Sequence, residues 1–364
     1  MKIKEVTKNI EDFAPLAYQE EYDNSGFQVG MPDAEVTGVL ITIDVTEAVI
    51  DEAIEKRCNL IIAHHPLIFG KLKKIIGRNA VERCVAKAIK NDITVYACHT
   101  NIDKMSNGVS ARFARELGLK NCRTLVPEGG LLEKLVTFVP MAQAEQVRQA
   151  LYAAGAGHIG NYDHCSYNLD GKGTFRASEG CRPFVGEIDA DHVEPETRIE
   201  VILKKKEESR VVEALVEAHP YEEPAYDLFA LQNRYDRVGL GVVGELETAM
   251  DEEEFLRHLK GIVENGGIRH TELLGKKVKR VALCGGSGAE FLHDAIGEAA
   301  DVYISCDFKY HQFFEAEKKI LIADVGHFES ERFTKEIFFE IVSKNNPKFA
   351  IYISSCKTNP INYI

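Results

Sequence analysis

The stretch Leu60-Ile-Ile-Ala-His-His-Pro66 joins a short apolar run to two adjacent histidines and a proline. Residues 60–63 are typical of a buried strand, and Pro66 ends that strand because proline has no backbone N–H to donate. His64 and His65 are therefore predicted where a strand meets a loop, which is the edge at which open α/β sheets bind ligands.

Adjacent side chains on a strand point to opposite faces, so two neighbouring histidines that serve one site must straddle it from the strand end. This arrangement favours two metal ions over one. The alternative is that His64 and His65 are ordinary hydrogen-bonded side chains, because a short motif on its own has a real rate of false matches. The polar residues at later strand ends bear on this choice.

Length and charge exclude several classes of protein. The chain has 364 residues, too many for one ordinary core, so two domains are expected. Its net charge of -13 argues against non-specific binding to nucleic acid and to an anionic membrane surface. No apolar run approaches the ~18 residues that span a bilayer, and residues 1–8 lack the apolar core of a signal peptide, so a cytoplasmic protein is expected. The nine cysteines form no CxxC pair, and their odd number fits buried free thiols in a reducing compartment.

Apolar periodicity predicts two β-α-β units around the first motif. Strands are expected at 36–43, 60–63 and 93–97, with helices at 48–56, 80–91 and 108–117. Thr46 is the expected N-cap of the first of these helices. Residues 1–22 are expected to form two short helices divided at Pro15, followed by a glycine-bearing loop at 23–30.

The character of the chain changes after residue 126. Strands at 135–139, 199–203 and 226–229 and helices at 142–154 and 211–218 are expected around a glycine-rich meander at 155–186, an order that resembles a ferredoxin-like domain. The first pattern resumes at Val238, with strands at 278–284, 302–305, 320–323 and 349–354 and helices at 290–298, 308–317 and 330–342. We therefore expect one α/β domain, residues 1–126 and 234–364, interrupted by an insert at 127–233.

Two more strand ends offer side chains that bind metals. Cys98-His-Thr-Asn-Ile-Asp103 follows the strand at 93–97, and the alternative role for Asp103 is an N-cap or an Asx-turn. Asp324-Val-Gly-His-Phe-Glu-Ser-Glu331 follows the strand at 320–323. His327 and Glu331 are four residues apart, so on a helix they share one face and can present two ligands to one point. A solvated His/Glu pair at a helix start is the alternative.

Together these strand ends offer five candidate ligands: His64, His65, Asp103, His327 and Glu331. Imidazole and carboxylate groups suit zinc, manganese, iron, cobalt or nickel better than calcium. Five ligands cannot close two tetrahedral shells even if Glu331 or Asp103 bridges, so positions stay open for water or substrate, as in a catalytic site. Two ions about 3.5–4 Å apart would share a water and make it a nucleophile at neutral pH.

Two glycine-rich stretches are less specific. Cys284-Gly-Gly-Ser-Gly288 lies between a strand and a helix, where its amides would cradle an anion or form a tight turn. Gly239-Leu-Gly-Val-Val-Gly244 matches GxGxxG, but a polar joint precedes it and no helix follows at once, so we reject a dinucleotide site.

Further polar residues are candidates for a part in the chemistry. Lys309, Tyr310 and His311 follow the strand at 302–305 and would orient a substrate, with His311 also a candidate proton donor; a purely structural role is equally expected. His99 is a candidate to support a metal ligand from behind, or to act in catalysis.

The histidine motifs in combination resemble the GTP cyclohydrolase I type 2 family of di-metal proteins, also called the NIF-three family. The motifs are His64-His65-Pro66, His99-Thr-Asn-Ile-Asp103, His327-Phe-Glu-Ser-Glu331, Asp307-Phe-Lys-Tyr-His311, Cys284-Gly-Gly-Ser-Gly288 and Asp23-Asn-Ser-Gly26. The middle segment resembles the PII/CutA-like insert of longer bacterial members through Gly160-Asn-Tyr-Asp163, Gly171-Lys-Gly-Thr-Phe175 and His219-Pro-Tyr-Glu-Glu-Pro-Ala-Tyr-Asp227. One departure is Cys306, where members usually have glycine; it concerns the local backbone rather than the metals.

The resemblance implies a ligand set, an assembly and an activity. His65 and Asp103 would hold one metal, His64 and His327 the other, and Glu331 would bridge them. Two divalent ions per chain are implied, zinc first and iron, manganese, cobalt or nickel as alternatives. The chain would form a toroidal homohexamer whose sites face an internal cavity and whose inserts cap its ends. The implied reaction is hydrolytic opening of the imidazole ring of GTP.

A second class of function stays open beside the hydrolase. Domains that resemble PII sense small molecules, and the family name comes from a protein-interaction setting, so a metal-binding regulatory or interaction scaffold without catalysis, with a small-molecule or nucleotide ligand, is the alternative. Open metal coordination together with turnover would favour the enzyme. Ligands saturated by the protein, with partner binding through the insert, would favour the scaffold.

Overall fold

The computed structural model describes residues 1–264, 266–345 and 348–364. The chain divides into two compact units. The first unit consists of Met1–Pro127 and Asp236–Ile364, and the second unit of Glu128–Tyr235. Within the described residues, no helix is both long enough and apolar enough to cross a membrane.

The first unit contains a five-stranded sheet in the order β1-β4-β3-β2-β15. Its strands are β1 (Gly26–Val29), β2 (Gly38–Thr42), β3 (Leu60–Ala63), β4 (Thr94–Ala97) and β15 (Ala350–Ile353). β1 runs antiparallel to β4 and the other neighbours are parallel. β2, β3 and β4 are buried along their whole length, which explains why they appear in the sequence as continuous apolar runs.

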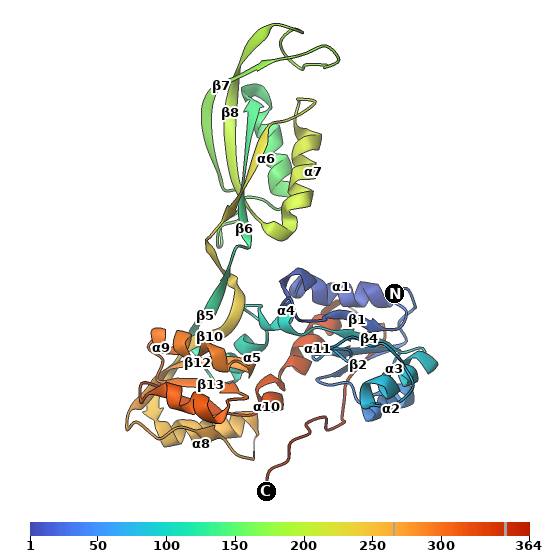
Figure 1. The fold of residues 1–364 in the computed structure, drawn as a ribbon, viewed down its shortest axis with the longest axis vertical. Helices are drawn as coiled ribbons and strands as arrows, with labels where there is room; N and C mark the ends of the chain where they lie inside the picture. Colours follow the sequence, from blue (N-terminus) through green and yellow to red (C-terminus); the bar gives the residue numbers. More distant parts are fainter. Residues whose placement is uncertain (265, 346–347) are drawn as a thin grey trace. The chain divides into compact units, whose positions relative to one another are not determined.

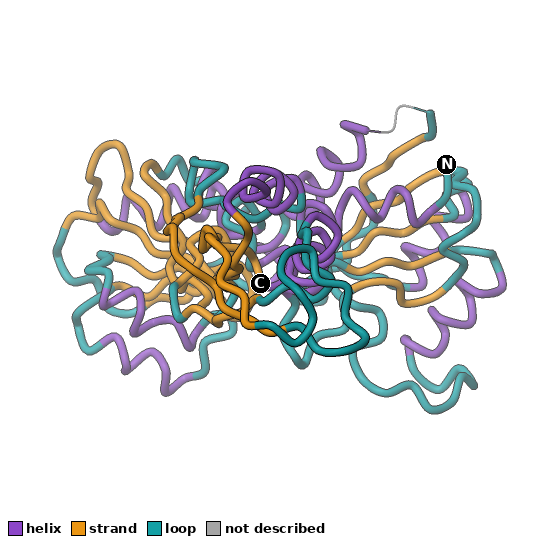
Figure 2. Tube along the Cα trace, turned by 90° about the horizontal axis from the view of Figure 1, so that it is seen from above, coloured by secondary structure: helices purple, strands orange, loops and turns teal. Residues whose placement is uncertain are grey.

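Helices cover both faces of this sheet, as Figure 2 shows near the N-terminus. One face packs against α1 (Ile3–Phe13) and α11 (Thr334–Asn345), and the other against α2 (Glu47–Glu55) and α3 (Ala80–Lys90). The predicted cap is present, because Thr46 Oγ1 accepts a hydrogen bond of 3.3 Å from the Val49 amide at the start of α2. The loop expected at 23–30 was wrong in part, since β1 occupies its second half as an edge strand.

A six-stranded sheet forms the rest of the first unit, in the order β11-β14-β13-β12-β10-β5. Its strands are β5 (Lys120–Gly129), β10 (Arg234–Asp251), β11 (Arg269–His270), β12 (Lys277–Ser287), β13 (Val302–Cys306) and β14 (Leu321–Asp324). The associated helices are α4 (Thr100–Asp103), α5 (Val109–Glu116), α8 (Glu252–Val263), α9 (Leu292–Gly297) and α10 (His327–Glu331). The rejected GxGxxG match at 239–244 lies inside β10, so it forms no phosphate-binding turn.

Two predicted helices of this region differ in the structure. The helix expected at 308–317 is a 3₁₀ helix, Tyr310–Ala316, and the one expected at 330–342 is replaced by α10 and α11. α10 begins at His327, and the Thr334 hydroxyl donates a 2.7 Å hydrogen bond to the Glu331 carbonyl where it ends. His327 and Glu331 therefore stand at the two ends of one short helix.

The second unit is an antiparallel sheet in the order β7-β8-β6-β9 with two helices packed on one face (Figure 1). In chain order its elements are β6 (Leu132–Pro140), α6 (Ala144–Ala153), β7 (Ser166–Arg176), β8 (Asp191–Lys204), α7 (Glu208–Ala218) and β9 (Tyr226–Leu231). β7 occupies residues 166–176 of the glycine-rich meander expected at 155–186. β7 is an edge strand, largely exposed and interrupted by Gly171 and Gly173, so its sequence lacks the apolar alternation of a half-buried strand.

All nine cysteines are free. The expected burial holds for five of them, Cys58, Cys84, Cys98, Cys284 and Cys306, while Cys122 and Cys181 are exposed.

Candidate metal centre

The first unit brings all five predicted ligands to one point. His64 and His65 directly follow β3, Asp103 ends α4 just beyond β4, and His327 and Glu331 come from α10 just beyond β14. The shortest separations between their side-chain atoms run from 3.0 to 3.8 Å. Residues separated by more than 200 positions in sequence therefore meet because parallel strands of two sheets end here.

Three of the five form a tight triangle. His65 Nε2 lies 3.3 Å from His327 Nε2, and Glu331 Oε2 lies 3.0 Å from the first nitrogen and 3.2 Å from the second. The edge of a tetrahedron around an ion with bonds of about 2.0–2.1 Å is about 3.3 Å. These three atoms are thus spaced as three corners of one coordination shell, and they could hold a metal ion.

Of the two remaining ligands, His64 lies near the other oxygen of Glu331 and also near Asp103. His64 Nε2 is 3.5 Å from Glu331 Oε1 and 3.8 Å from Asp103 Oδ1. The resemblance implied that His65 pairs with Asp103 and His64 with His327. The donor distances group them differently, with His65 beside His327 and His64 beside Asp103, while Glu331 stays between the two groups.

Several of these polar atoms are buried without a hydrogen bond. Among the described residues they include His64 Nε2, Asp103 Oδ1 and Glu331 Oε2. Glu331 is only 2 % exposed, and a buried carboxylate costs several kcal/mol unless nearby positive charge offsets its loss of hydration. A cation at the centre would satisfy all three atoms, so the donor set fits a divalent metal on physical grounds that do not depend on the motif.

Each histidine is oriented from behind by an acceptor on its Nδ1 nitrogen. His64 Nδ1 donates to the Cys98 carbonyl at 3.0 Å, His65 Nδ1 to Asp44 Oδ1 at 2.7 Å, and His327 Nδ1 to Asp307 Oδ2 at 2.7 Å. These bonds fix the ring so that Nε2 points into the cluster, as in carboxylate–histidine–metal triads.

Sequence reasoning missed the orienting roles of Asp44 and Asp307. Both are the first acidic residue after an apolar strand, β2 and β13 respectively, and polar residues after β3, β4 and β14 were the signal that predicted the candidate ligands. Asp307 also adopts a left-handed backbone with φ of 60°, which is unfavourable for a residue other than glycine, and its carboxylate reaches His327 from there.

Burial and charge set the protonation of the cluster. Burial lowers the pKa of His65, but the nearby carboxylates of Asp44 and Glu331 outweigh burial and raise this pKa to about 10. Burial likewise opposes the charged form of Glu331, yet the surrounding histidines hold its pKa well below the usual range. Burial raises the pKa of Asp103, and the neighbouring Glu331 raises it further. Unless a cation is bound, His65 therefore keeps a proton at neutral pH.

His99 lies at the edge of the cluster, and together with His64 and His65 it forms a group that could hold a metal ion. Its ring centroid is 5.3 Å from that of His64 and 5.4 Å from that of His65. Its Nδ1 nitrogen bonds to Asp23 Oδ1 at 2.8 Å, and Asp23 also accepts hydrogen bonds from the amide and hydroxyl of Thr100. The early Asp23-Asn-Ser-Gly26 motif thus holds His99 in place, a role that the sequence did not reveal.

A cavity of about 340 Å³ opens onto the cluster. Beside the ligands, its lining includes Glu20, Tyr22, Phe69, His99, Glu290 and Phe291, and it contains no lysine or arginine among the residues that the structure describes. Aromatic rings and carboxylates therefore dominate the approach to the centre.

Residues 284–287, the end of β12, also line this cavity, and two of their amides are occupied. The Gly285 amide donates to Ser110 Oγ at 3.1 Å and the Gly286 amide to Ser330 Oγ at 2.8 Å. A Cβ atom on Gly286 would lie 2.2 Å from Glu331 Oε1, and this residue has a φ of 71°. This end of β12 thus makes room for Glu331, and two of its amides are not free to bind an anion.

His311 does not line the cavity. It lies on the exposed 3₁₀ helix Tyr310–Ala316, where its ring contacts Tyr310 and Phe314. Lys309 forms the N-terminal cap of this helix, and Tyr310 is 73 % exposed. Within this chain, the structure brings His99 to the site but not these three residues.

Comparison with known proteins agrees with the geometry. The family model described as Duf34/NIF3 (NGG1p interacting factor 3) matches residues 1–360. The chain is 38% identical over 366 residues to the "GTP cyclohydrolase 1 type 2 homolog" of Bacillus subtilis, covering 99% of this chain and 98% of that protein. It is 40% identical over 365 residues to the protein of the same name from Halalkalibacterium halodurans, with the same coverage of both.

Solved structures include a similar fold over the whole length. The crystal structure of the Bacillus cereus protein related to NIF3 superposes with a TM-score of 0.87 at 38% identity, covering 100% of this chain and 99% of that one. Family model, relatives and structure agree, and the chain belongs to the Duf34/NIF3 family.

Proposed function

We propose that the first unit binds two divalent metal ions and acts as a metal-dependent hydrolase. Zinc is the first candidate, followed by iron, manganese, cobalt and nickel, because all five ligands are imidazole or carboxylate groups. The observation that carries this proposal is a set of buried polar atoms without a hydrogen bond, among them His64 Nε2, Asp103 Oδ1 and Glu331 Oε2, beside an open cavity. One ion would lie between His65, His327 and Glu331, and the other between His64, Asp103 and Glu331.

The ions would supply a water molecule whose pKa is low enough to give a nucleophile near neutral pH. The chain's own residues would do the rest. Asp44 and Asp307 keep the ligand nitrogens of His65 and His327 aimed at the centre. Asp23 holds Nδ1 of His99, which leaves Nε2 as the atom that can receive or give a proton at the cavity.

We propose a nitrogen heterocycle as the substrate class. Relatives carry the name GTP cyclohydrolase 1 type 2 homolog, and opening of the guanine imidazole ring of GTP is the reaction that the name suggests. Tyr22, Phe69 and Phe291 give the cavity flat apolar walls suited to such a ring. A triphosphate would find no cationic side chain in the described lining, so the ions themselves would have to balance its charge.

The experiment is metal quantification on protein purified without added metal, followed by a hydrolysis screen. The screen covers GTP, guanosine and other nucleotides and phosphates, with wild-type protein and the Glu331→Ala variant side by side. Turnover that requires metal and is lost in Glu331→Ala would support the proposal. Protein that binds no metal at all would overturn it.

A regulatory or interaction scaffold is the second candidate. The description of the family as an interacting factor favours it, and so does the separate second unit. Full metal occupancy without turnover on any compound of the screen, together with partner binding that is lost when residues 128–235 are removed, would select the scaffold.

We also propose the finer architecture. The second unit would be a ferredoxin-like, PII/CutA-like insert at 127–233 between the two parts of the α/β domain, 1–126 and 234–364; its β-α-β-β-α-β order supports this. The chain would assemble as a toroidal homohexamer in the cytoplasm. Analytical ultracentrifugation tests the assembly, and a monomer at micromolar concentration would contradict it.

A further inference from the structure

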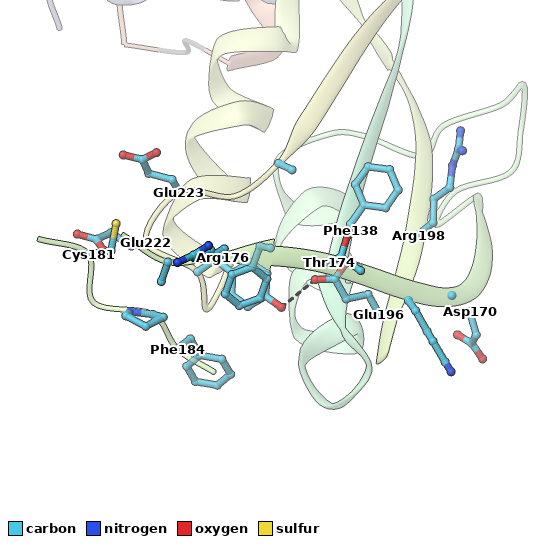
Figure 3. Close-up of a pocket in the computed structure, with 18 of the residues that line it drawn as sticks. Phe138, Asp170, Thr174, Arg176, Cys181, Phe184, Glu196, Arg198, Glu222 and Glu223 are labelled. Atoms are coloured by element: carbon cyan, nitrogen blue, oxygen red, sulfur yellow. Dashed lines mark hydrogen bonds between the residues drawn. The ribbon is translucent and has the colours of Figure 1, made fainter. Parts of the chain in front are cut away.

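The second unit contains a cleft of about 740 Å³, within the range of small-molecule sites. Leu135, Val139, Ile199 and Val201 point toward the helices. Phe138, Glu196 and Arg198, which alternate with these residues on the same strands, line the cleft. The cleft therefore lies on the face of the sheet that the helices leave uncovered. Figure 3 shows its lining side chains.

A buried carboxylate lies at the centre of the cleft. Glu196 is 7 % exposed, and its Oε1 accepts a hydrogen bond of 2.8 Å from the Tyr221 hydroxyl, drawn as a dashed line in Figure 3. A Cβ atom on Gly173 would lie 2.1 Å from Glu196 Oε2. A glycine at this position of β7 is what leaves room for the carboxylate.

Tyr221 is held in place by a neutral histidine. The Tyr221 amide donates to His219 Nδ1 at 3.0 Å, and His219 Nε2 bonds to the Phe138 carbonyl at 3.0 Å. Burial lowers the pKa of His219, so the ring stays neutral with its proton on Nε2. These bonds position the Tyr221 side chain beside Glu196. Both His219 and Tyr221 belong to the motif His219-Pro-Tyr-Glu-Glu-Pro-Ala-Tyr-Asp227, which the metal centre does not use.

The walls of the cleft are aromatic. Tyr221 lies 6.0 Å from Phe175 and 6.4 Å from Phe184 between ring centroids, and Phe138 lines the opposite side under the Arg198 guanidinium. Flat apolar walls around one carboxylate favour a planar ligand with hydrogen-bond donors on its edge.

Charge in the cleft disfavours a polyanion. Arg198 already pairs with Glu200 at 2.8 Å, and Arg176 lies 3.9 Å from Asp189. The lining carries four acidic residues, Asp170, Glu196, Glu222 and Glu223, against three basic ones, Lys172, Arg176 and Arg198.

We propose that this cleft binds a planar small molecule with two adjacent N–H donors, which the Glu196 carboxylate receives between the aromatic walls. A guanidinium group and the amino-amide edge of a guanine-type ring share this donor pattern, and a carboxylate accepts it through two parallel hydrogen bonds. The site lies wholly within the second unit and is independent of the metal centre. It would give the chain a sensor for such a ligand.

Isothermal titration calorimetry on the full chain tests the proposal with named probes. Guanosine and agmatine carry the paired donors; inosine, which lacks the 2-amino group, and 1,4-diaminobutane, which has ammonium groups only, are their matched counterparts. We expect guanosine or agmatine to bind at least ~10-fold more tightly than its counterpart. Agmatine alone would identify a guanidinium ligand and guanosine alone a heterocycle, and either result supports the proposal.

Variants locate the binding. Glu196→Gln keeps the size of the side chain but replaces one acceptor oxygen by a donor, and we expect it to weaken the bound probe at least ~10-fold. Tyr221→Phe, which removes only the bond that aims Glu196, should weaken it less. Glu217→Gln, an exposed site on α7 with the same charge change, should bind as the wild type does.

Three results would overturn the proposal. The first is that neither guanosine nor agmatine binds at millimolar concentration. The second is that a probe that binds does so no more tightly than its counterpart, and the third is that Glu196→Gln binds this probe as the wild type does. If Glu196→Gln does not fold, the probe comparison on wild-type protein and the Tyr221→Phe variant still decide. Glu331→Ala should bind the probe normally, so loss of the metal centre cannot be mistaken for loss of this site.

Discussion

The metal centre of the first unit and the cleft of the second unit both set a buried carboxylate against a glycine. Glu331 Oε1 lies 2.2 Å from where a Cβ atom on Gly286 would be, and Glu196 Oε2 lies 2.1 Å from the corresponding position on Gly173. The surroundings differ. Glu331 is ringed by histidines and has a buried oxygen without a hydrogen bond, whereas Glu196 accepts a hydrogen bond from a tyrosine among aromatic rings.

This difference indicates what each site is built to hold. A buried carboxylate among several imidazole nitrogens is a set of ligands suited to a small divalent cation. A buried carboxylate with one bond already made, beside about 740 Å³ of space, can accept N–H donors from an organic ligand. The same device, a glycine that admits a carboxylate, therefore serves two kinds of chemistry.

The largest effect is expected from removing the glutamate between the two histidine groups. Glu331→Ala should lose both metal ions, because Glu331 offers one oxygen to each group. His99→Ala should keep at least one ion, since His99 lies beside the cluster and bonds to Asp23. Inductively coupled plasma mass spectrometry on the purified variants measures both, and full metal occupancy in Glu331→Ala would refute the bridging role.

The orienting carboxylates should have the next largest effect. Asp44→Asn and Asp307→Asn each leave a ligand histidine without its charged partner, and we expect metal affinity to fall by about 10–100-fold. Asp33→Asn is the matched control, because Asp33 is exposed and pairs with Lys4 at the surface. Competition with a chromogenic chelator measures the affinities, and equal values for all three variants would show that neither carboxylate supports the centre.

The two glycines allow the sites to be disturbed one at a time. Gly286→Ala should lower metal affinity by about 10-fold or more, since its Cβ displaces Glu331 and its positive φ adds about 1–2 kcal/mol of strain. It should leave probe binding to the cleft unchanged. Gly173→Ala should weaken probe binding to the cleft and leave metal affinity unchanged. If either substitution affected both sites equally, the two sites would not be independent.

Proton release gives a smaller, graded test. The pKa of His65 is raised to about 10 and that of His327 is also raised. Both rings are therefore protonated near neutral pH until a metal ion displaces their Nε2 protons. Metal binding should therefore release about two protons per chain at pH 7, and apparent affinity should rise with pH from neutral to about pH 10, the pKa of His65. Calorimetry in buffers of different ionisation enthalpy counts the protons, and zero release would contradict the protonation described here.

The sequence was enough to predict that the five candidate ligands meet, because each follows an apolar strand, and strand ends of parallel sheets converge. The sequence could not show which of the candidate ligands lie next to each other. That pairing depends on side-chain rotation, which moves the ligand atoms by a few ångströms. The sequence also missed Asp44, Asp23 and Asp307 as partners, because a single acid after a strand is equally common as a cap or turn. The cleft was hidden more deeply, because β7, which lines it, was not predicted, and because Glu196 and Tyr221 come from β8 and from the segment after α7.

Anomalous X-ray diffraction at a metal absorption edge, on crystals of the wild-type chain, tests the central claim most directly. The account predicts two peaks per chain on either side of the Glu331 carboxylate, one beside His65 and His327 and the other beside His64 and Asp103. Peaks located elsewhere, or none at this cluster in metal-loaded protein, would contradict it.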